Sequence, residues 1–197
     1  MYQTILSAAG ELFLERGYEH FSLRQVSERI GYATGTIYLY FKDKDEVLFK
    51  IAQDGFARFE QQLERAIESE SEPRARLKAM GRAYIAFGMQ NPAAYQLMFV
   101  QRPEFLLHAQ QIKEQKEESF GGRALDLLYE VIEQSMEAGV IRPGTVDSTA
   151  DALWATVHGF VTLATCFPDF DRERLERDTE AVLELIANGF RPCPDQG

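Results

Sequence analysis

The segment of residues 34–46, T-G-T-I-Y-L-Y-F-K-D-K-D-E, gathers hydrogen-bond donors within a few residues of one another. The donors are three hydroxyl groups and one ammonium group, those of Thr36, Tyr38, Tyr40 and Lys44. Groups of this kind bind phosphate and sugar oxygens in protein–DNA complexes, where they fix the register of the protein on the duplex. The chemistry that this segment favours is therefore phosphate binding by neutral and cationic donors.

The other residues of the segment predict a short helix with one buried face. Ile37 and Phe41 are four residues apart, so they lie on the same side of a helix and can hold it to a core. Thr34 is predicted to cap this helix, which runs to about Tyr40. Thr34 and Gly35 also keep its beginning small, which allows another surface to approach closely. The pattern thus predicts a helix that packs by one face and presents the other.

A second predicted helix precedes this one, and the pair has the spacing of a helix-turn-helix. Ser22 and Gln25 fit a capping box, in which each side chain accepts a hydrogen bond from the backbone N–H of the other residue. Gly31 suits the end of that helix because glycine tolerates the left-handed conformation found there. Helix, short turn with glycine, helix over residues 22–40 is the arrangement whose second helix enters the major groove of DNA.

Further helices are predicted on both sides of this pair. An amphipathic helix comes first, and Gly17 is predicted to stop it. Asp43 and Glu46 fit another capping box, which begins a long helix. Helical periodicity continues along the chain, without strand alternation or a fixed repeat. The predicted fold class is all-α, with an N-terminal three-helix helix-turn-helix head (1–45) and a larger helical-bundle body (46–197).

The charge of the chain is strongly acidic but unevenly distributed. The formal net charge is -10 over 197 residues. Residues 1–50 hold six Lys or Arg against seven Asp or Glu, and the remainder holds 15 against 24. Such acidity excludes non-specific coating of nucleic acid, which needs a basic surface. Any contact with DNA is therefore expected from the first quarter of the chain.

Several other classes of protein lack support in the sequence. No apolar run approaches twenty residues and no secretory signal is recognisable, so the expected location is the cytoplasm. Cys166 and Cys193 lack the spacing of a metal site, and His20, His108 and His158 are far apart, so neither a metal nor a cofactor is predicted. Glycine-rich phosphate loops, nucleophile elbows and zinc helix motifs do not occur, which argues against an enzyme.

Residues 4–49 resemble the DNA-binding domain of the TetR family of transcriptional regulators. The resemblance rests on Ala-x-x-Leu-Phe-x-x-x-Gly, on the helix-turn-helix that follows it, and on Gly-Thr-Ile-Tyr-x-Tyr-Phe-Lys-x-Lys-Asp. The rest of the chain is similar to the variable regulatory body of that family. W-A-T-V-H-G (154–159), with N-P-A-A-Y-Q-L-M-F upstream (91–99), looks like a subgroup whose C-terminal domain carries a Trp-His-Gly signature.

The resemblance implies direct contacts with bases for three residues of the helix-turn-helix. Arg24 is implied to reach a base edge, most naturally a guanine because its guanidinium is two-pronged. Thr34 and Gly35 are implied to lie at bases. Leu39 departs from the polar or aromatic residue often found at its position. Two interpretations of Leu39 stay open, contact with a thymine methyl group or simple exposure.

The resemblance implies contacts with the DNA backbone for the donors noted above. Thr36, Tyr38 and Lys44 are implied to bind phosphates, and Tyr40 either a phosphate or a base. Without the resemblance, the two tyrosines are equally well read as half-buried aromatic residues. Arg24 is likewise read as an ordinary solvated arginine when the motif is disregarded.

The resemblance also implies a homodimer, formed by the last two predicted helices, 147–166 and 171–189. A dimer is needed to read a two-fold symmetric operator. Gly159, inside the first of these helices, costs about 1 kcal/mol relative to alanine. Close approach of a neighbouring helix is the predicted compensation, and an incidental small residue is the alternative.

A small, largely apolar inducer is expected to bind the body. The candidate ligand-binding residues are aromatic, apolar or polar side chains at helical spacing: Tyr84, Phe87, Met98, Phe99, Leu128, Tyr129, Trp154 and His158. Such residues also suit an ordinary core, with Trp154 buried and His158 satisfied inside the protein or at an interface. The predicted function is a ligand-responsive repressor that binds a palindromic operator. An activator, or a helical ligand-binding or enzymatic protein without DNA binding, is the alternative.

Overall fold

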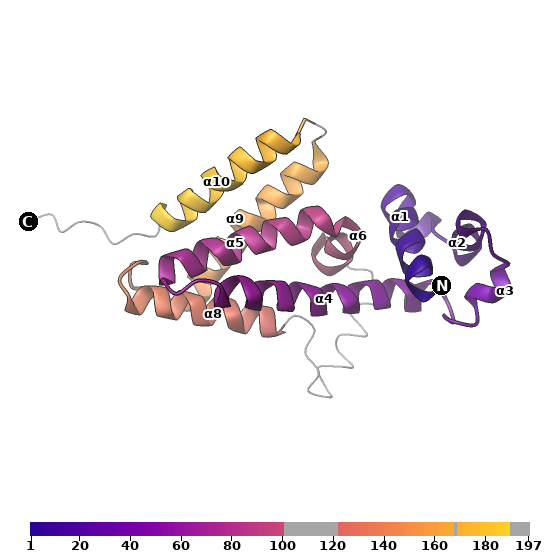
Figure 1. Cartoon of the computed structure of the whole chain (residues 1–197), viewed down its shortest axis with the longest axis horizontal. Coiled ribbons are helices and arrows are strands. Elements are labelled where there is room, and N and C mark those ends of the chain that lie inside the picture. The colour runs from indigo at the N-terminus through magenta and orange to yellow at the C-terminus, as the bar shows by residue number, and fades with distance from the viewer. Residues whose placement is uncertain (101–121, 168, 190–197) are drawn as a thin grey trace, which may run out of the picture. The chain divides into compact units, whose positions relative to one another are not determined.

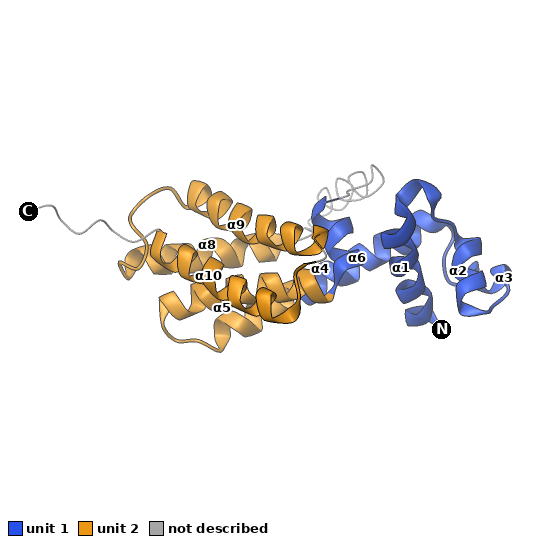
Figure 2. Ribbon diagram, turned by 90° about the horizontal axis from the view of Figure 1, so that it is seen from above, with its two compact units in different colours: residues 1–58, 91–120 blue, residues 59–90, 121–197 orange. Residues whose placement is uncertain are grey.

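The computed structural model describes residues 1–100, 122–167 and 169–189, and the elements in these ranges are helices (Figure 1). This confirms the predicted all-α class. The chain divides into two compact units, coloured separately in Figure 2. Unit 1 is Met1–Arg58 with Asn91–Phe120, and unit 2 is Phe59–Gln90 with Gly121–Gly197. The predicted boundary at residues 45 and 46, between a DNA-binding domain and a regulatory domain, is a different division and stays a prediction.

The helices of each unit have the following bounds. Unit 1 holds α1 (Tyr2–His20), α2 (Leu23–Ile30), α3 (Thr34–Ile37), the first part of α4 (Lys44–Glu68), α6 (Pro92–Tyr95) and the π-helix η1 (Gln96–Val100). Unit 2 holds the rest of α4, then α5 (Pro73–Gln90), α8 (Gly122–Glu137), α9 (Val146–Cys166) and α10 (Arg172–Gly189). His108 and Cys193 lie outside the described residues.

The predicted start and end of the second helix are confirmed, whereas the predicted end of the first is not. The backbone N–H of Ser22 donates to Gln25 Oε1 at 2.9 Å, and the backbone N–H of Gln25 donates to Ser22 Oγ at 3.4 Å, so the capping box forms. Gly31 ends α2 with a φ of 75°. Gly17 leaves the helical conformation with a φ of 69°, but one more turn follows it to His20. The glycine therefore kinks α1 instead of ending it.

The predicted cap of α4 is confirmed, but the reciprocal bond of its capping box has a different partner. Asp43 caps the helix, since its Oδ1 accepts a hydrogen bond from the backbone N–H of Glu46 at 2.9 Å. The carboxylate of Glu46 accepts from the backbone N–H of Lys42. The predicted partner was the N–H of Asp43. The reciprocal bond of the capping box is thus displaced toward the turn that follows α3.

In unit 1, a single core joins α1, α2, α3 and the start of α4. Its members are apolar and almost completely buried: Ile5, Leu12, Phe13, Val26, Ile37, Phe41, Val47 and Leu48. Tyr2 stacks on Phe41, with ring centroids 5.1 Å apart. The core confirms that Ile37 and Phe41 form the hidden face of the helix that carries the DNA-binding candidates.

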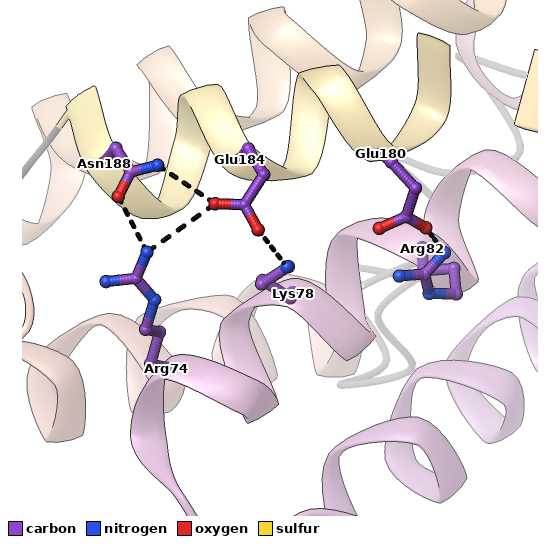
Figure 3. Close-up of polar contacts among 6 residues, drawn as sticks. All are labelled: Arg74, Lys78, Arg82, Glu180, Glu184 and Asn188. Carbon is purple, nitrogen blue, oxygen red and sulfur yellow. Dashed lines mark hydrogen bonds and ion pairs between the residues drawn. The ribbon is translucent and has the colours of Figure 1, made fainter. Parts of the chain in front are cut away.

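In unit 2, α5 packs against α8, α9 and α10. A ladder of polar contacts joins α5 to α10 (Figure 3). Its rungs are Arg74 with Asn188 at 2.7 Å, Lys78 with Glu184 at 2.6 Å, and Arg82 with Glu180. Next to the ladder, a Cβ added to Gly81 would lie 2.8 Å from Leu183 Cδ2, so the two helices approach closely there.

The ladder fixes the register of α10 on α5. Its side chains recur every four residues on each helix, so a shift of either helix by one turn would misalign every pair. The pairs are partly exposed, which limits the contribution of each to stability. Arg82 and Lys78 lower the pKa values of the Glu180 and Glu184 carboxyl groups, respectively, below their ordinary value of 4.5.

No helix in the described ranges is long and apolar enough to cross a membrane.

The ladder predicts a specific loss of stability in acid. Because the pKa of each glutamate is lower in the folded protein, its pair stabilises the fold above pH 4.5 and loses that effect as the pH falls below it. The double substitution Glu180→Gln and Glu184→Gln should therefore flatten the dependence of unfolding free energy on pH. Urea denaturation at several pH values from about 5.5 to about 3.5 measures this.

Glu173→Gln with Glu176→Gln is the matched control for this experiment. It removes two exposed glutamates from the same helix but leaves the ladder intact. The wild-type slope should persist in this control. Equal flattening in both double variants would mean that net charge, and not the ladder, governs acid stability.

Candidate functional site

The helical turns after α3 present a continuous exposed surface. The backbone N–H groups of Tyr40 and Phe41 both donate to the carbonyl of Ile37, at 2.9 and 3.1 Å, so the chain keeps coiling beyond the end of α3. Tyr38 is 57% exposed, Leu39 82% and Tyr40 43%. Buried Ile37 and Phe41 hold the opposite side. The arrangement presents an aromatic and apolar face outward on a fixed support.

Thr34 does not cap α3, contrary to the prediction. The N-cap is Ala33, and no side chain bonds the free N–H groups of that end. The hydroxyl of Thr34 instead lies 2.8 Å from Ser27 Oγ, and Ser27 Oγ donates to the carbonyl of Arg24 at 2.7 Å. Since the serine has one hydroxyl proton, Thr34 must be the donor in the first bond. Thr34 is therefore drawn toward α2 and ties the two helices together.

Arg24 lies exposed on α2 with part of its guanidinium available. Its Nε donates to Glu28 at 2.9 Å, with side chains 81% and 60% exposed. An ion pair this exposed contributes little and is easily exchanged for another partner. None of the described residues pairs with its Nη1 or Nη2. The side chain thus keeps the two-pronged geometry that recognition of a guanine requires.

Lys44 is held at the start of α4 by a residue that the sequence did not single out. Its Nζ donates to the carbonyl oxygen of Tyr18 at 2.9 Å and lies 4.1 Å from the centre of the Tyr18 ring. The Tyr18 hydroxyl donates to Asp45 Oδ1 at 2.8 Å, and this bond raises the pKa of Tyr18 to about 12. These contacts join the end of α1 to α4, and they compete with the predicted phosphate contact of Lys44.

The seven predicted DNA-binding residues all lie in unit 1. They occupy α2, α3 with the turns after it, and the first residue of α4. Gly35 is exposed, and a Cβ added there would meet nothing within 4 Å, so open space lies over the backbone at this point. Thr36 is half-buried. The structure thus gathers the candidates near one helix-turn-helix.

The predicted ligand-binding residues divide between the two units. Met98 and Phe99 belong to η1 in unit 1. Met98 is buried, and a Cβ added to Gly55 of α4 would lie 2.8 Å from its Sδ. Phe99 contacts the rings of Phe56 and Tyr95, at centroid distances of 5.8 and 5.2 Å. These contacts make an aromatic cluster between η1, α6 and the first part of α4.

Gln96, at the start of η1, is a candidate that sequence reasoning missed. Its Oε1 atom is buried and accepts no hydrogen bond from any described residue. A buried acceptor without a donor costs about 1–3 kcal/mol. The segment is also a π-helix, a distortion that is frequent at functional sites. A polar residue inside an apolar run was the only signal in the sequence, and it does not reveal an unsatisfied atom.

In unit 2, Tyr84 joins two of the other predicted ligand-binding residues by hydrogen bonds. Trp154 Nε1 donates to the Tyr84 hydroxyl at 2.9 Å, and that hydroxyl lies 3.2 Å from His158 Nδ1. Burial lowers the pKa of His158, which favours the neutral ring and lets Nδ1 accept. Trp154 is 44% exposed, so the interpretation of it as a core residue is wrong. His158 is half-buried and satisfied by Tyr84.

The remaining candidates in unit 2 have simpler surroundings. Phe87 is completely buried and packs on Phe59 with ring centroids 5.0 Å apart, as a core residue does. Tyr129 is half-buried, and burial together with a hydrogen bond to Asp147 raises its pKa. Leu128 is half-buried. Among the described residues, no group of three or more metal-binding side chains occurs.

Two family models match the chain over most of its length. The model for the tetR family of bacterial regulatory proteins matches residues 5–51, which include the whole helix-turn-helix. The model for the tetracyclin repressor-like C-terminal domain matches residues 77–190, more than half of the chain. Neither confirms the finer assignment to a subgroup with a Trp-His-Gly signature, which stays a prediction.

Comparison with known proteins leads to the same family. A fatty acid metabolism regulator protein of Bacillus subtilis (strain 168) is 24% identical over 190 residues, covering 96% of this chain and 95% of that protein. The structure of the regulator FadR from Bacillus subtilis with stearoyl-CoA has a TM-score of 0.75 at 23% identity, covering 96% and 99% of the two chains. AibR, in complex with isovaleryl coenzyme A and operator DNA, gives 0.73 at 22%, covering 98% and 99%. The protein therefore belongs to the TetR family of DNA-binding transcriptional regulators.

Proposed function

We propose that this protein is a homodimeric repressor that binds a palindromic operator and releases it when an acyl thioester binds. The observation that carries the proposal is the exposed face formed by Tyr38, Leu39 and Tyr40 beside Arg24, within the segment that matches the family's DNA-binding model. Family membership decides against a helical ligand-binding or enzymatic protein without DNA binding. The place of action that follows for a DNA-binding regulator is the cytoplasm.

We infer that Arg24 supplies base recognition and that the tyrosines supply position. Arg24 offers a two-pronged donor, which distinguishes guanine from the other bases. The hydroxyls of Tyr38 and Tyr40 stand on the exposed side of the helix and suit phosphates on either side of the groove. Thr36 and Gly35 belong to the same surface. Thr34 lies next to them, with its hydroxyl directed toward Ser27 of α2.

The dimer is proposed through α9 and α10, because α9 exposes an apolar stripe and α10 exposes a leucine. On α9 the stripe recurs every three or four residues and consists of Ala152, Ala155, Gly159 and Leu163, and it continues to Phe167 just after the helix. Leu163 is 52% exposed and Phe167 55%, and a Cβ added to Gly159 would meet nothing within 4 Å. On α10, Leu185 is 63% exposed. Small residues among larger apolar ones suit the close packing of a second copy's helices.

The ligand class is inferred from relatives together with the chemistry of the candidate residues. FadR of Bacillus subtilis was solved with stearoyl-CoA and AibR with isovaleryl coenzyme A. An acyl thioester of coenzyme A combines an apolar chain with amide N–H groups. The aromatic cluster around Phe99 suits the apolar part, and the unpaired Oε1 of Gln96 suits an amide donor.

The helix α4 gives a route from ligand to DNA. It is one continuous helix that begins in unit 1 with Lys44 and ends in unit 2 with Glu68. A ligand changes operator affinity only if it binds one conformation of the protein better than the other. We infer that the acyl thioester favours a conformation in which α4 holds the two heads at a spacing that does not match the operator.

Two substitutions test the separate roles that we propose for Arg24, in base recognition, and Tyr38, in phosphate contact. Arg24→Ala should cost about 1–3 kcal/mol on the operator and relax the choice of one base pair, because it removes base recognition. Tyr38→Ala should weaken binding to all sequences alike, because phosphates are the same everywhere. Fluorescence anisotropy with the selected operator and with single-base variants measures both effects.

Arg58→Ala is the control for these two variants. It removes an exposed arginine of unit 1 that lies on α4, away from the helix-turn-helix. It should leave the choice of base unchanged. Operator binding that neither Arg24→Ala nor Tyr38→Ala alters would exclude the proposed interface.

The dimer is testable by placing a charge on the proposed seam. Leu163→Glu or Leu185→Glu buries an unpaired carboxylate if a second copy covers the residue, so the dimer should dissociate while helicity is kept. Analytical ultracentrifugation at micromolar concentration measures the mass, and circular dichroism checks the fold. Leu125→Glu, at a 46% exposed leucine of α8, is the control and should remain dimeric. A wild-type monomer at that concentration would contradict the dimer itself.

The role of Gln96 is testable because its substitution should weaken the response to ligand without lowering the stability of the protein. Gln96→Leu removes a buried acceptor for which the described residues supply no donor, so the unfolding free energy should stay constant or rise. The same change removes the proposed bond to the ligand, so release of the operator should need about fivefold more stearoyl-CoA or isovaleryl-CoA.

Gln62→Leu is the matched control. The Gln62 Nε2 atom donates to the carbonyl of Ala83 at 3.0 Å, so its loss should cost about 1 kcal/mol of stability. Its ligand response should stay at the wild-type level. The assignment of Gln96 fails if its substitution destabilises the protein as much as the control does, or if the response to the ligand is unchanged.

A further inference from the structure

Leu39 is the most exposed of the large apolar side chains in the described part of the chain. It is 82% exposed, and the next is Leu185 at 63%. A single exposed leucine is ordinary on a protein surface. Leu39, however, stands between two exposed tyrosines on the surface that the family membership assigns to DNA. Its position therefore calls for a partner on the duplex.

The geometry points Leu39 directly away from the core of the head. It lies two residues from Ile37 and two from Phe41, and a helical residue turns by about 100°, so Leu39 is roughly opposite both buried anchors. Gly35 lies one turn earlier on the same side and carries no side chain to obstruct an approach. The backbone can thus come close to a groove at Gly35 while Leu39 extends furthest into it.

The chemistry of the side chain restricts what it can read. Leucine neither donates nor accepts a hydrogen bond, so it gains nothing from phosphates or from polar base edges. The one apolar group that the base edges of the major groove present is the C5 methyl group of thymine. We propose that Leu39 reads a thymine in each half-site by contact with this methyl group. This assignment rests on the proposed DNA-binding function and adds a residue that determines sequence preference.

Deoxyuridine gives a test that changes only the methyl group. The operator is first recovered by selection from random DNA with the wild-type protein. Each thymine of a half-site, and its symmetry mate, is then replaced by deoxyuridine, which keeps every hydrogen bond of the base pair. For the wild type, one position should lose about fourfold in affinity per half-site, the value expected for one buried methyl group. The other thymines should show little change.

The variants then connect this loss to Leu39. In Leu39→Ala, the loss on deoxyuridine substitution at that position should disappear, whereas Leu39→Met, which keeps an apolar reach, should retain most of it. Leu14→Ala changes another exposed leucine of unit 1, on α1, and should behave as the wild type does. A double-mutant cycle between protein and DNA isolates the coupling from any general loss of affinity.

The outcomes separate the assignment from the function on which it rests. If Leu39→Ala weakens binding to all DNA equally and the deoxyuridine loss persists, Leu39 contacts sugars and does not read thymine, and the assignment is overturned. If no thymine position responds to deoxyuridine in the wild type, it is overturned as well. Failure of the wild type to select any operator, or to bind DNA in a salt-dependent way, would instead refute the DNA-binding function.

Discussion

The attachment of α3 to the head is the constraint on which the proposed DNA-binding surface depends. A helix of four residues cannot be stable alone, because nucleation is costly and few hydrogen bonds follow it. Ile37 and Phe41 bury one side of these turns, and the Ser27–Thr34 bond joins their beginning to α2. The hydroxyl donors on the exposed side of these turns are held in place because the buried side is fixed. Loss of these anchoring contacts would therefore disrupt the whole proposed DNA-binding surface, instead of a single contact within it.

The same logic extends from the head to the rest of each unit. In unit 1, the contacts of Tyr18 with Lys44 and Asp45 hold the end of α1 to the first turn of α4. In unit 2, the ladder between α5 and α10 fixes one helix register where a bare apolar contact would allow several. Polar contacts thus set the geometry, whereas apolar burial supplies most of the stability. The continuity of α4 through both units gives a ligand signal a covalent path.

The sequence predicted features that depend on neighbouring residues and missed those that depend on distant ones. The capping box of Ser22 and Gln25, the left-handed Gly31 and the buried pair Ile37 and Phe41 follow from local spacing, and all of them are confirmed. The capping role of Thr34 was wrong because Ser27, on the preceding helix, offers its hydroxyl a competing partner.

Distance along the chain also explains the errors in the body. Trp154 is partly exposed, yet its indole N–H donates to Tyr84, 70 residues earlier, and no periodicity encodes such a bond. The rungs of the ladder join residues about 100 positions apart, and a count of charges cannot pair them. The unsatisfied acceptor of Gln96 could not be predicted for a different reason. Whether a buried atom lacks a donor depends on the residues that surround it in the folded protein.

The distribution of charge in the head explains how an acidic protein can still bind DNA selectively. Several cations of unit 1 are already engaged: Arg29 holds Glu15 through two bonds, Lys50 holds Asp54, and Lys44 contacts Tyr18. Neutral hydroxyl donors release no counterions when they bind phosphate, so they add little to the non-specific, salt-dependent term of affinity. With that term small and the body acidic, we expect random DNA to be bound weakly. Base contacts then decide a larger share of the binding energy, which favours the operator over the excess of other sites.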